Sequence, residues 1–587
     1  MQTQSSSQAL SRRAALRLFG SAAGVALLAA CGPASAPAAP TSAASSAAQT
    51  TVAPAAQATT APAQAATAPA PQATTAPVPT ANDPAAKAGF IPVGVGLTST
   101  APATAPKGQP RSGGMLTEGN LGDLPNLDGH WINGQHTTYP IFDRLVDLDA
   151  SLQPHPALAE SWDVNPDFTQ ATFHLRQGVT WHTGRPFTSE DVAWNYNRIK
   201  SDRKIDGGIK ANFFTPLASI ETPDANTVVL HATQPWPALF NVLAWTNLID
   251  PQTPPEQNQP VGTGPFTFVE WVQGDHITLK KNPNYWQSGK PYLDGIKVRI
   301  FTDPQSMAAE LEGGGIDVAI LPLMRDAARL AKDSTYQVVY NQNSGSVNLL
   351  LAQTKDASAP TGNKLFRQAL NYAMDRKRFS DTVLLGVGTP KALPVTPTNP
   401  AYDATKDQAY AFDLDRARSL IQQSGVSNPT LEVVYSTSAP DYASVVQIYQ
   451  ADLAKIGVTL TLNPASQVVF IDQLFNSKFA GLAANGSLFG QLHPAFFWGN
   501  AYYSPNANWA SFKSDEYSQL ADGLLKETDP AKQKQVYAQW LDYILDQSWA
   551  LPYSNTVPRA ATTARVQGLQ YNMTEFLMAN DVWLMSS

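Results

Sequence analysis

The sequence is poor in cysteine and in positive charge, and each shortage excludes a class of protein. Its single cysteine, Cys31, rules out a disulfide framework. The 47 acidic residues outnumber the 40 basic ones, which gives a net charge of -7. Because a nucleic-acid surface needs clustered basic residues, no nucleic-acid partner is expected.

Signatures of the common enzyme classes are also missing. The sequence holds no Gly-x-Ser-x-Gly elbow, no His-Glu-x-x-His and no Gly-x-x-x-x-Gly-Lys loop. Residues 201–204 fit Ser-x-x-Lys, but no Lys-Thr-Gly accompanies them, so the match is expected by chance. The sequence therefore predicts a protein that is not an enzyme.

Histidine is scarce and scattered. Of eight histidines, the closest pair in the expected folded part is His130 and His136, and this pair does not have the tight spacing of a dedicated metal site. We expect no metal ligands and no cofactor. Binding of nickel or a metal complex stays open as an alternative.

Charge is absent from one long stretch, residues 479–512. It has no Asp, Glu, Lys or Arg but is rich in aromatic residues interleaved with Asn, Gln and Ser. Its polar residues and prolines interrupt any run of the length a membrane span needs. Two interpretations stay open for the aromatic rings, because they suit either an ordinary core or the wall of a ligand pocket.

Residues 1–30 have the layout of a signal peptide. Arginines precede an apolar stretch, residues 18–30, which is too short for a comfortable transmembrane helix. The sequence Leu28-Ala29-Ala30-Cys31-Gly32 resembles a bacterial lipobox. That resemblance implies cleavage before Cys31 and lipidation of its sulfur, against the alternative of a buried core cysteine.

The export route stays open. Residues 11–17, Ser-Arg-Arg-Ala-Ala-Leu-Arg, resemble a twin-arginine motif but depart from it at Ala15, where that motif prefers Phe. The general secretory route is the alternative. By either route the mature protein lies at the outer face of the cytoplasmic membrane, on the cell surface or in the periplasm.

After the cysteine comes a segment dominated by Ala, Pro, Thr, Ser and Gln. From Gly32 to about Pro106 its only charged residues are Asp83 and Lys87. Such a composition buries too little apolar area to offset the entropy of ordering, so residues 31–112 are predicted to be a lipidated cysteine and a disordered tether. O-glycosylation of the tether stays open.

Helical and strand patterns alternate in the rest of the chain, which is typical of an α/β protein. Thr188 and Asp191 resemble a capping box at the start of a helix. Glycines end two helices, and Asp529-Pro530 begins another. The expected strands are 171–176, 179–182, 266–272, 276–280, 431–435 and 458–462, and the expected helices begin at 188 or span 365–379, 414–424, 442–456, 514–526 and 530–547.

Two of these patterns carry finer expectations. Gly262 and Gly264 are expected to adopt backbone torsions closed to other residues, so that the chain turns sharply into the strand 266–272. In the helix 365–379 apolar residues recur at helical spacing, and the charges around them, Arg367 and Arg376 among them, are expected to be solvated.

Four motifs together resemble one known family. The run from Pro156 to Ile199 is followed by Pro-Val-Gly-Thr-Gly-Pro-Phe at 260–266, Asn-Pro-Asn-Tyr-Trp at 282–286 and Phe-Arg-Gln-Ala-Leu-Asn-Tyr-Ala-Met-Asp-Arg at 366–376. In this order they resemble the extracellular solute-binding proteins of ATP-driven importers, of the peptide, nickel and oligopeptide class (solute-binding family 5). The resemblance runs from about Gly114 to the C-terminus.

The resemblance implies a fold and a division into domains. The fold is α/β and two-lobed, of the periplasmic-binding-protein type II kind, in the large class with an extra subdomain and a hinge between the lobes. Lobe I comprises residues 113–346 plus 553–587, with the extra subdomain at about 156–255. Lobe II comprises residues 347–552.

The resemblance also implies where a solute binds. In peptide-binding relatives an Asp after the position of Gly486 pairs with the ligand's amino group. Alignment on Pro494 puts Gly490 at that position and Ser487 at the position of a family Trp. Because a buried ammonium without a counter-charge is costly, the missing Asp favours a neutral or weakly charged solute, such as an oligosaccharide-like molecule or a peptide held by its backbone.

The candidate binding residues combine stacking faces with hydrogen-bonding groups. Phe489, Phe496, Phe497 and Trp498 are expected to stack on the solute, and Asn485 and Gln491 to bond it beside Gly490. By position in the family, Trp131, Asn133, Ser346 and Asn348 face them.

The expected partners are a solute, an ABC permease with its ATPase subunits, and the membrane through a lipid anchor at Cys31. The protein is expected to be a monomer. A lipoprotein that senses or scaffolds without transport stays open as the alternative.

Overall fold

The structure is a computed structural model that describes residues 107–131, 135–149, 152–202, 204–205, 209–253, 258–341, 346–487, 489–498, 502–506, 508–571 and 578–585. All of them belong to one compact unit, Pro77–Ser587. The predicted signal peptide, the predicted lipidation site Cys31 and most of the predicted tether lie outside the described residues.

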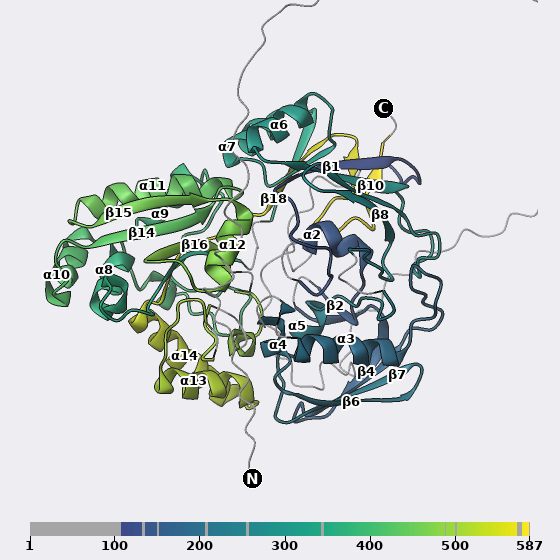
Figure 1. Ribbon diagram of the computed structural model, residues 1–587, viewed down its shortest axis with the longest axis horizontal. Helices are drawn as coiled ribbons and strands as arrows, with labels where there is room; N and C mark the ends of the chain where they lie inside the picture. The colour runs from purple at the N-terminus through teal and green to yellow at the C-terminus, as the bar shows by residue number, and fades with distance from the viewer. Residues whose placement is uncertain are drawn as a thin grey trace, which may run out of the picture. The chain divides into compact units, whose positions relative to one another are not determined.

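The first sheet has seven strands in the order β12-β18-β11-β1-β10-β9-β8. β1 pairs in parallel with β10 and β11, while β18 pairs antiparallel with β11 and β12. Figure 1 shows that β18, near the C-terminus, completes the sheet that the first described strand begins. In sheet order the strands are β12 (Tyr336–Tyr340), β18 (Arg559–Thr563), β11 (Val318–Ile320), β1 (Met115–Leu121), β10 (Gly295–Phe301), β9 (His276–Lys281) and β8 (Phe266–Val272).

Two helices follow strands of this sheet, α6 (Pro304–Glu312) after β10 and α7 (Met324–Leu330) after β11. Asp303 caps α6, because its carboxylate accepts the Ser306 N–H at 2.7 Å. The smaller elements near this sheet are α2 (Gln135–Thr138), η2 (Tyr139–Ile141) and the two-stranded sheet of β19 (Val566–Gln567) with β20 (Trp583–Leu584). The two-stranded sheet of β2 (Val146–Leu148) with β3 (Pro154–Pro156) lies beside α5 (Leu239–Ala244) and β4 (Ala159–Val164).

The second sheet has five strands in the order β15-β14-β16-β13-β17, with β14 parallel to β15 and β16. Helices α8, α10 and α11 pack on one face and form an apolar core with it (Figure 1). The strands are β13 (Val347–Ala352), β14 (Thr430–Ser436), β15 (Thr459–Ala465), β16 (Leu482–Ser487) and β17 (Ala550–Asn555). The helical segments are η5 (Pro360–Gly362), α8 (Lys364–Tyr372), α9 (Arg376–Thr382), η6 (Lys406–Gln408), α10 (Leu414–Ser424), α11 (Pro440–Ala454), α12 (Gln467–Phe475), η7 (Pro494–Trp498), α13 (Asp515–Lys526) and α14 (Pro530–Gln547).

The third sheet is antiparallel, in the order β4-β5-β7-β6. Its apolar side chains share one core cluster with α3, α5 and part of the second-sheet region. Its elements are β4 (Ala159–Val164), β5 (Gln170–Leu175), α3 (Ser189–Ser201), α4 (Ile209–Phe213), β6 (Leu217–Asp224), β7 (Thr227–Ala232) and α5 (Leu239–Ala244).

Several local predictions are confirmed. The Thr188 N–H donates to the Asp191 carboxylate at 2.9 Å at the start of α3, as the capping box predicts. α10 and α14 have the predicted bounds, and Gly425 ends α10 in the left-handed region. β8 and β9 form the expected hairpin, with Val272 opposite His276.

Three local predictions are wrong. The predicted helix 365–379 is two helices, α8 and α9, and two of its charged residues are not solvated: Arg367 and Arg376 are buried. Arg367 donates to the carbonyl of Gln547, and Arg376 to those of Lys391 and Pro552. Burial lowers the pKa of Arg376 to about 10. A guanidinium has five donors, so backbone carbonyls can satisfy it inside a core where the hydrophobic pattern alone predicts solvent.

The other two errors concern a strand and a corner. Residues 179–182 form only an isolated bridge, between Thr180 and Pro186. Gly262 and Gly264 do form a corner, but neither has a positive φ. A Cβ on Gly262 would lie 2.0 Å from the Ile141 carbonyl oxygen, so close approach of backbone, rather than a special torsion, requires glycine there.

The predicted division into lobes at residues 346/347 and 552/553, with the subdomain at about 156–255, stays a prediction. β17 extends through Asn555, so it crosses the second of these positions.

Candidate functional site

Part of the uncharged stretch 479–512 packs against the region of the third sheet. The Phe496 ring in η7 stacks on Phe213 of α4, with centroids 4.0 Å apart and planes 21° apart. Phe489 packs on Trp245 at 5.1 Å. We call these four rings, with Asn241 of α5 and His493, the aromatic contact.

A hydrogen bond and a neutral histidine complete the aromatic contact. The His493 backbone N–H donates to Asn241 Oδ1 at 3.2 Å. Its ring accepts the Ala495 N–H at Nδ1 and meets the Tyr537 hydroxyl at Nε2. Burial lowers the pKa of His493 to about 4, so the ring is neutral at pH 7.

The stacking candidates are covered by protein. Phe489, Phe496 and Phe497 expose 4%, 1% and 0% of their surface, and Phe497 packs on Trp540 at 5.1 Å. The backbone of Trp498 belongs to η7, but its side chain lies outside the described residues. Stacking of these four rings on a solute stays a prediction.

Gly490 is held through its backbone. Its carbonyl accepts the Thr396 N–H and the Asn399 side-chain amide, each at 3.0 Å. Gln491 beside it is fully buried. Because residues 479–512 contain no acidic side chain, nothing in this stretch replaces the carboxylate that the sequence lacks at Gly490.

The polar candidates lie at the ends of β13 and β16. The Asn485 side-chain amide donates to the Tyr502 hydroxyl, which in turn donates to the Gly486 carbonyl at 2.8 Å. Asn348 donates to Ser554 Oγ at 3.1 Å. Ser346 is fully buried before β13, and its carbonyl accepts the Thr556 N–H.

Of the two candidate binding residues in the first half of the chain, the structure describes one. Trp131 is half-buried, and its backbone N–H donates to the Asp128 carbonyl at 3.0 Å. Asn133 lies outside the described residues.

The sequence did not single out the Ser487 hydroxyl as a binding group. Ser487 ends β16, is fully buried, and its Oγ has no hydrogen-bond partner within the described part of the chain. Leaving such a group unsatisfied costs about 1–3 kcal/mol, so it is a natural position for a solute contact. In the sequence, the one signal for Ser487 was its alignment with a Trp position of the peptide-binding relatives.

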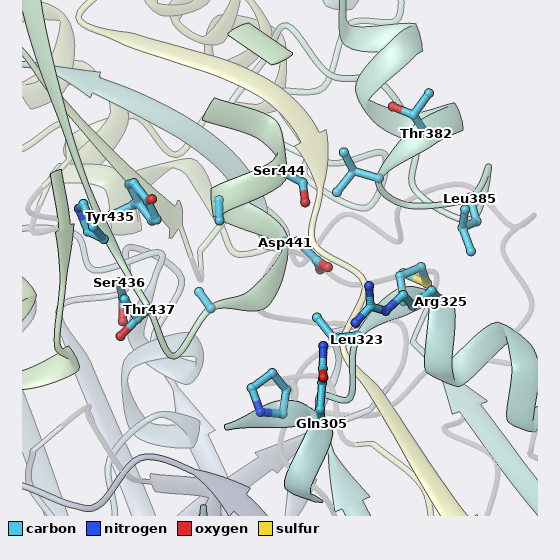
Figure 2. A pocket seen from close by; sticks show the side chains of 16 residues that line it. Gln305, Leu323, Arg325, Thr382, Leu385, Tyr435, Ser436, Thr437, Asp441 and Ser444 are labelled. Atoms are coloured by element: carbon cyan, nitrogen blue, oxygen red, sulfur yellow. The ribbon is translucent and has the colours of Figure 1, made fainter. Parts of the chain in front are cut away.

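A cavity of about 460 Å³ lies at the carboxyl ends of strands from both large sheets. Its walls begin where β10 and β11 end in the first sheet and where β14 and β15 end in the second. Figure 2 shows Ser436 and Thr437 on one side, Arg325 and Leu385 on the other, and Asp441 and Ser444 between them. The full lining is Pro304, Gln305, Leu323, Met324, Arg325, Thr382, Val383, Leu385, Tyr435, Ser436, Thr437, Ala439, Asp441, Ala443, Ser444 and Pro464.

An ion pair joins the two sheets beside this cavity. Arg559 of β18 is 1% exposed and meets Asp441 of α11 with Nη2–Oδ1 and Nη1–Oδ2 distances of 3.1 and 3.0 Å. Arg559 also donates to the Pro322 carbonyl at 2.6 Å. No part of this cavity was predicted, because its lining is drawn from three segments, residues 304–325, 382–385 and 435–464, that share no motif.

The described residues offer neither a metal cluster nor a membrane-spanning helix. In that part of the chain, no three His, Cys, Asp or Glu side chains are grouped so that they could hold a metal ion. Nor does any helix among the described elements combine the length and the apolar character needed to cross a bilayer.

Comparison with known proteins places this geometry in a family. The sequence pattern of "Bacterial extracellular solute-binding proteins, family 5 Middle" matches residues 153–509. Heme-binding protein A of Haemophilus influenzae is 28% identical over 489 residues, covering 76% of this chain and 87% of that protein. Glutathione-binding protein GsiB of Salmonella typhimurium is 29% identical over 452 residues, covering 74% and 86%.

A solved structure is similar over nearly its whole length. The periplasmic binding protein AgaA from A. tumefaciens R10, in complex with agropinic acid, superposes with a TM-score of 0.73 at 25% identity. The match covers 81% of this chain and 99% of AgaA. The predicted two-lobed α/β fold of the periplasmic-binding-protein kind is thereby confirmed.

Proposed function

This chain belongs to the bacterial extracellular solute-binding proteins of family 5, which capture a solute and deliver it to an ABC importer, and we propose that its solute has no free ammonium group. The solute is held between the two large sheets, at the carboxyl ends of their strands, where open α/β sheets bind ligands. It is neutral or weakly charged, and either oligosaccharide-like or a peptide bound through its backbone.

One observation carries this proposal: among the described residues that line the cavity, no carboxylate is free to pair with an amine. The cavity lining holds a single acidic residue, Asp441, and Arg559 already occupies both of its oxygens. The stretch around Gly490 has no acidic residue. A buried ammonium here would lack a counter-charge, at a cost of several kcal/mol.

The relatives are named for or solved with different solutes and do not decide whether the solute of this chain has a free ammonium group. AgaA was solved with agropinic acid, and GsiB is named for glutathione. Nickel or a metal complex is the less favoured candidate.

The site residues proposed for the solute are the predicted ones together with the Ser487 hydroxyl. Lobe I (113–346 plus 553–587) closes on lobe II (347–552) about a hinge, and the solute contributes contacts to both. The family consists of solute-binding proteins. A catalytic role is accordingly not proposed for this chain.

The location proposed is the outer face of the cytoplasmic membrane. Cys31 carries the lipid, and residues 32–112 hold the receptor away from it as a flexible tether. The receptor acts as a monomer and delivers its solute to a permease with ATPase subunits. A sensing or scaffolding role is the alternative, which neighbouring genes for a permease and an ATPase would argue against.

Calorimetry with matched ligands tests the missing amine site. We expect N-acetylated dipeptides or neutral oligosaccharides to bind at least tenfold more tightly than the same dipeptides with a free amino group. The reverse order, with free dipeptides tightest and sugars inert, contradicts the proposal.

A gain of function offers the matched variant. Gly490→Asp restores a carboxylate at the family position, so free-amine dipeptides should gain about tenfold or more in affinity, in the range of a charge-assisted hydrogen bond. Gly490→Asn is the control, because it adds similar bulk without charge. Equal behaviour of the two variants would show that charge at this position does not decide recognition.

A further inference from the structure

The charge of the cavity is unbalanced. Of its sixteen lining residues only Arg325 and Asp441 are charged. Asp441 receives both terminal nitrogens of Arg559, which is itself buried and also held by the Pro322 carbonyl. The pair Asp441–Arg559 is therefore neutral as a unit, and Arg325 supplies an excess positive charge to the wall.

Arg325 has no hydrogen bond to any described residue. Its side chain is 65% exposed, and its nearest carboxylate is Asp326, with Nε and Oδ2 4.0 Å apart. That distance is too long for a hydrogen bond. The Asp326 carboxylate also lies 3.8 Å from Arg329, so its charge is shared between two guanidinium groups. Arg325 can thus turn its planar fork of donors to the cavity without losing an existing bond.

The rest of the wall mixes apolar side chains with hydroxyl groups. The exposed Leu385 lies on the same side as Arg325 in Figure 2, while Thr437 and Ser436 lie on the opposite side, beyond Asp441. A solute that spans the cavity therefore meets the Arg325 cation at one end, with Leu385 and Thr382 nearby, and Ser436 and Thr437 at the other.

We propose that this cavity binds the acidic end of the solute, with Arg325 holding a carboxylate through two parallel N–H donors. The side of the cavity with Ser436 and Thr437 takes the neutral, hydroxyl- or amide-rich remainder of the molecule. Arg559 is a positioning residue, because it neutralises Asp441 and so removes the repulsion that a free carboxylate would exert on an anion. The proposal rests on the proposed function and narrows it to solutes with a carboxylate and without a free ammonium.

The test is calorimetry with pairs of ligands that differ only in the carboxylate. Suitable pairs are maltobionate with maltitol, and N-acetylated tripeptides with a free C-terminus against their C-terminal amides. We expect at least one acid to bind the full-length protein about tenfold or more tightly than its neutral partner. Arg325→Gln should reduce that preference to within about twofold and leave the affinity of the neutral partner unchanged.

Two variants test whether the preference for the acid depends on the cavity or on surface charge in general. Arg329→Gln removes the same charge one helical turn away, where Arg329 pairs with Glu312 outside the cavity lining, and should keep the preference. Arg325→Lys keeps the charge but loses the fork, so we expect an intermediate preference.

The outcomes distinguish this inference from the function beneath it. If no acid in the panel binds more tightly than its neutral partner, or if Arg325→Gln keeps the preference, the acidic subsite is overturned while a neutral solute still fits the proposed function. If free-amine peptides bind most tightly of all, the proposed function fails as well.

Discussion

The aromatic contact joins the second-sheet region to the third-sheet region, and the cavity lies where the second sheet meets the first. The two places differ in what fills the space between the neighbouring regions. In the aromatic contact Phe213 and Phe496 stack face to face, with ring centroids 4.0 Å apart. Beside the cavity the ion pair Asp441–Arg559 and a small apolar cluster around Met324, Leu384 and Val557 join the two regions, and about 460 Å³ stays open. In this comparison the apolar rings hold the second-sheet and third-sheet regions together, and the proposed solute site lies in the more polar region.

The largest expected effect tests whether the aromatic contact persists in solution. Phe496→Ala removes a ring that is 1% exposed, so the free energy of unfolding should fall by about 3–5 kcal/mol in urea titrations. Phe213→Ala, across the contact, should cost a similar amount. A cost below about 1 kcal/mol for Phe213→Ala would mean that the contact opens in the solute-free protein. The aromatic contact would then not hold the two regions together, as the comparison with the cavity requires.

The ion pair beside the cavity should come next. Asp441→Asn leaves the buried Arg559 guanidinium without its counter-charge, which should cost about 3 kcal/mol of unfolding free energy. The lower end of the range for buried pairs applies, because the Asp441 side chain is 21% exposed. Asp381→Asn breaks the exposed pair with Lys377 and is the control, with an expected cost below about 0.5 kcal/mol.

A pH dependence should distinguish the aromatic contact from the cavity. The folded pKa of His493, about 4, lies below its ordinary value of 6.5, so the unfolded chain binds the extra proton between these pH values. Stability is full above pH 6.5 and falls as the pH drops towards 4. At pH 5 the two pKa values give an upper bound of about 2 kcal/mol for the loss of unfolding free energy. The measured loss should be smaller, because the ring is only half-buried.

The measurement is urea unfolding of the wild type and of His493→Gln at pH 7.5 and pH 5. His130 and His182 also have pKa values lowered by burial, to about 3 and about 4, so the wild-type slope alone does not isolate His493. A smaller loss in His493→Gln than in the wild type is the expected result. Equal losses would show that His493 contributes nothing to the slope.

The smallest effect on stability belongs to the cavity wall. Arg325→Gln changes an exposed side chain without a hydrogen bond to the described residues, so unfolding free energy should stay within about 0.5 kcal/mol of the wild type. Its effect should appear only in the binding of acidic solutes. A large loss of stability would mean that Arg325 is structural, which would remove the contrast between the two regions.

Local patterns in the sequence predicted many elements well. Caps and terminators identified helices such as α10 and α14, because those signals depend on residues within one or two turns. The helix at 365–379 failed for the opposite reason. Whether Arg367 is solvated depends on the Gln547 carbonyl, which lies 180 residues away in the chain.

The candidate site was predicted only in part, for the same reason. The aromatic composition of residues 479–512 and the missing carboxylate at Gly490 are visible in the sequence. The partners of the rings are not, because Phe213 precedes Phe496 by more than 280 residues. That the Ser487 hydroxyl has no partner among the described residues likewise becomes apparent only when its surroundings are known.

The sequence by itself determined the family, the alternation of helices and strands, and the absence of an acidic residue where relatives pair with an amine. These properties reside in short motifs and in composition. Tertiary structure alone decided that Phe489, Phe496 and Phe497 are buried among other rings, and that a cavity with an unbalanced arginine lies at the carboxyl ends of the two large sheets. The physical reason is that burial and charge balance are set by neighbours distant in the chain, which only folding brings together.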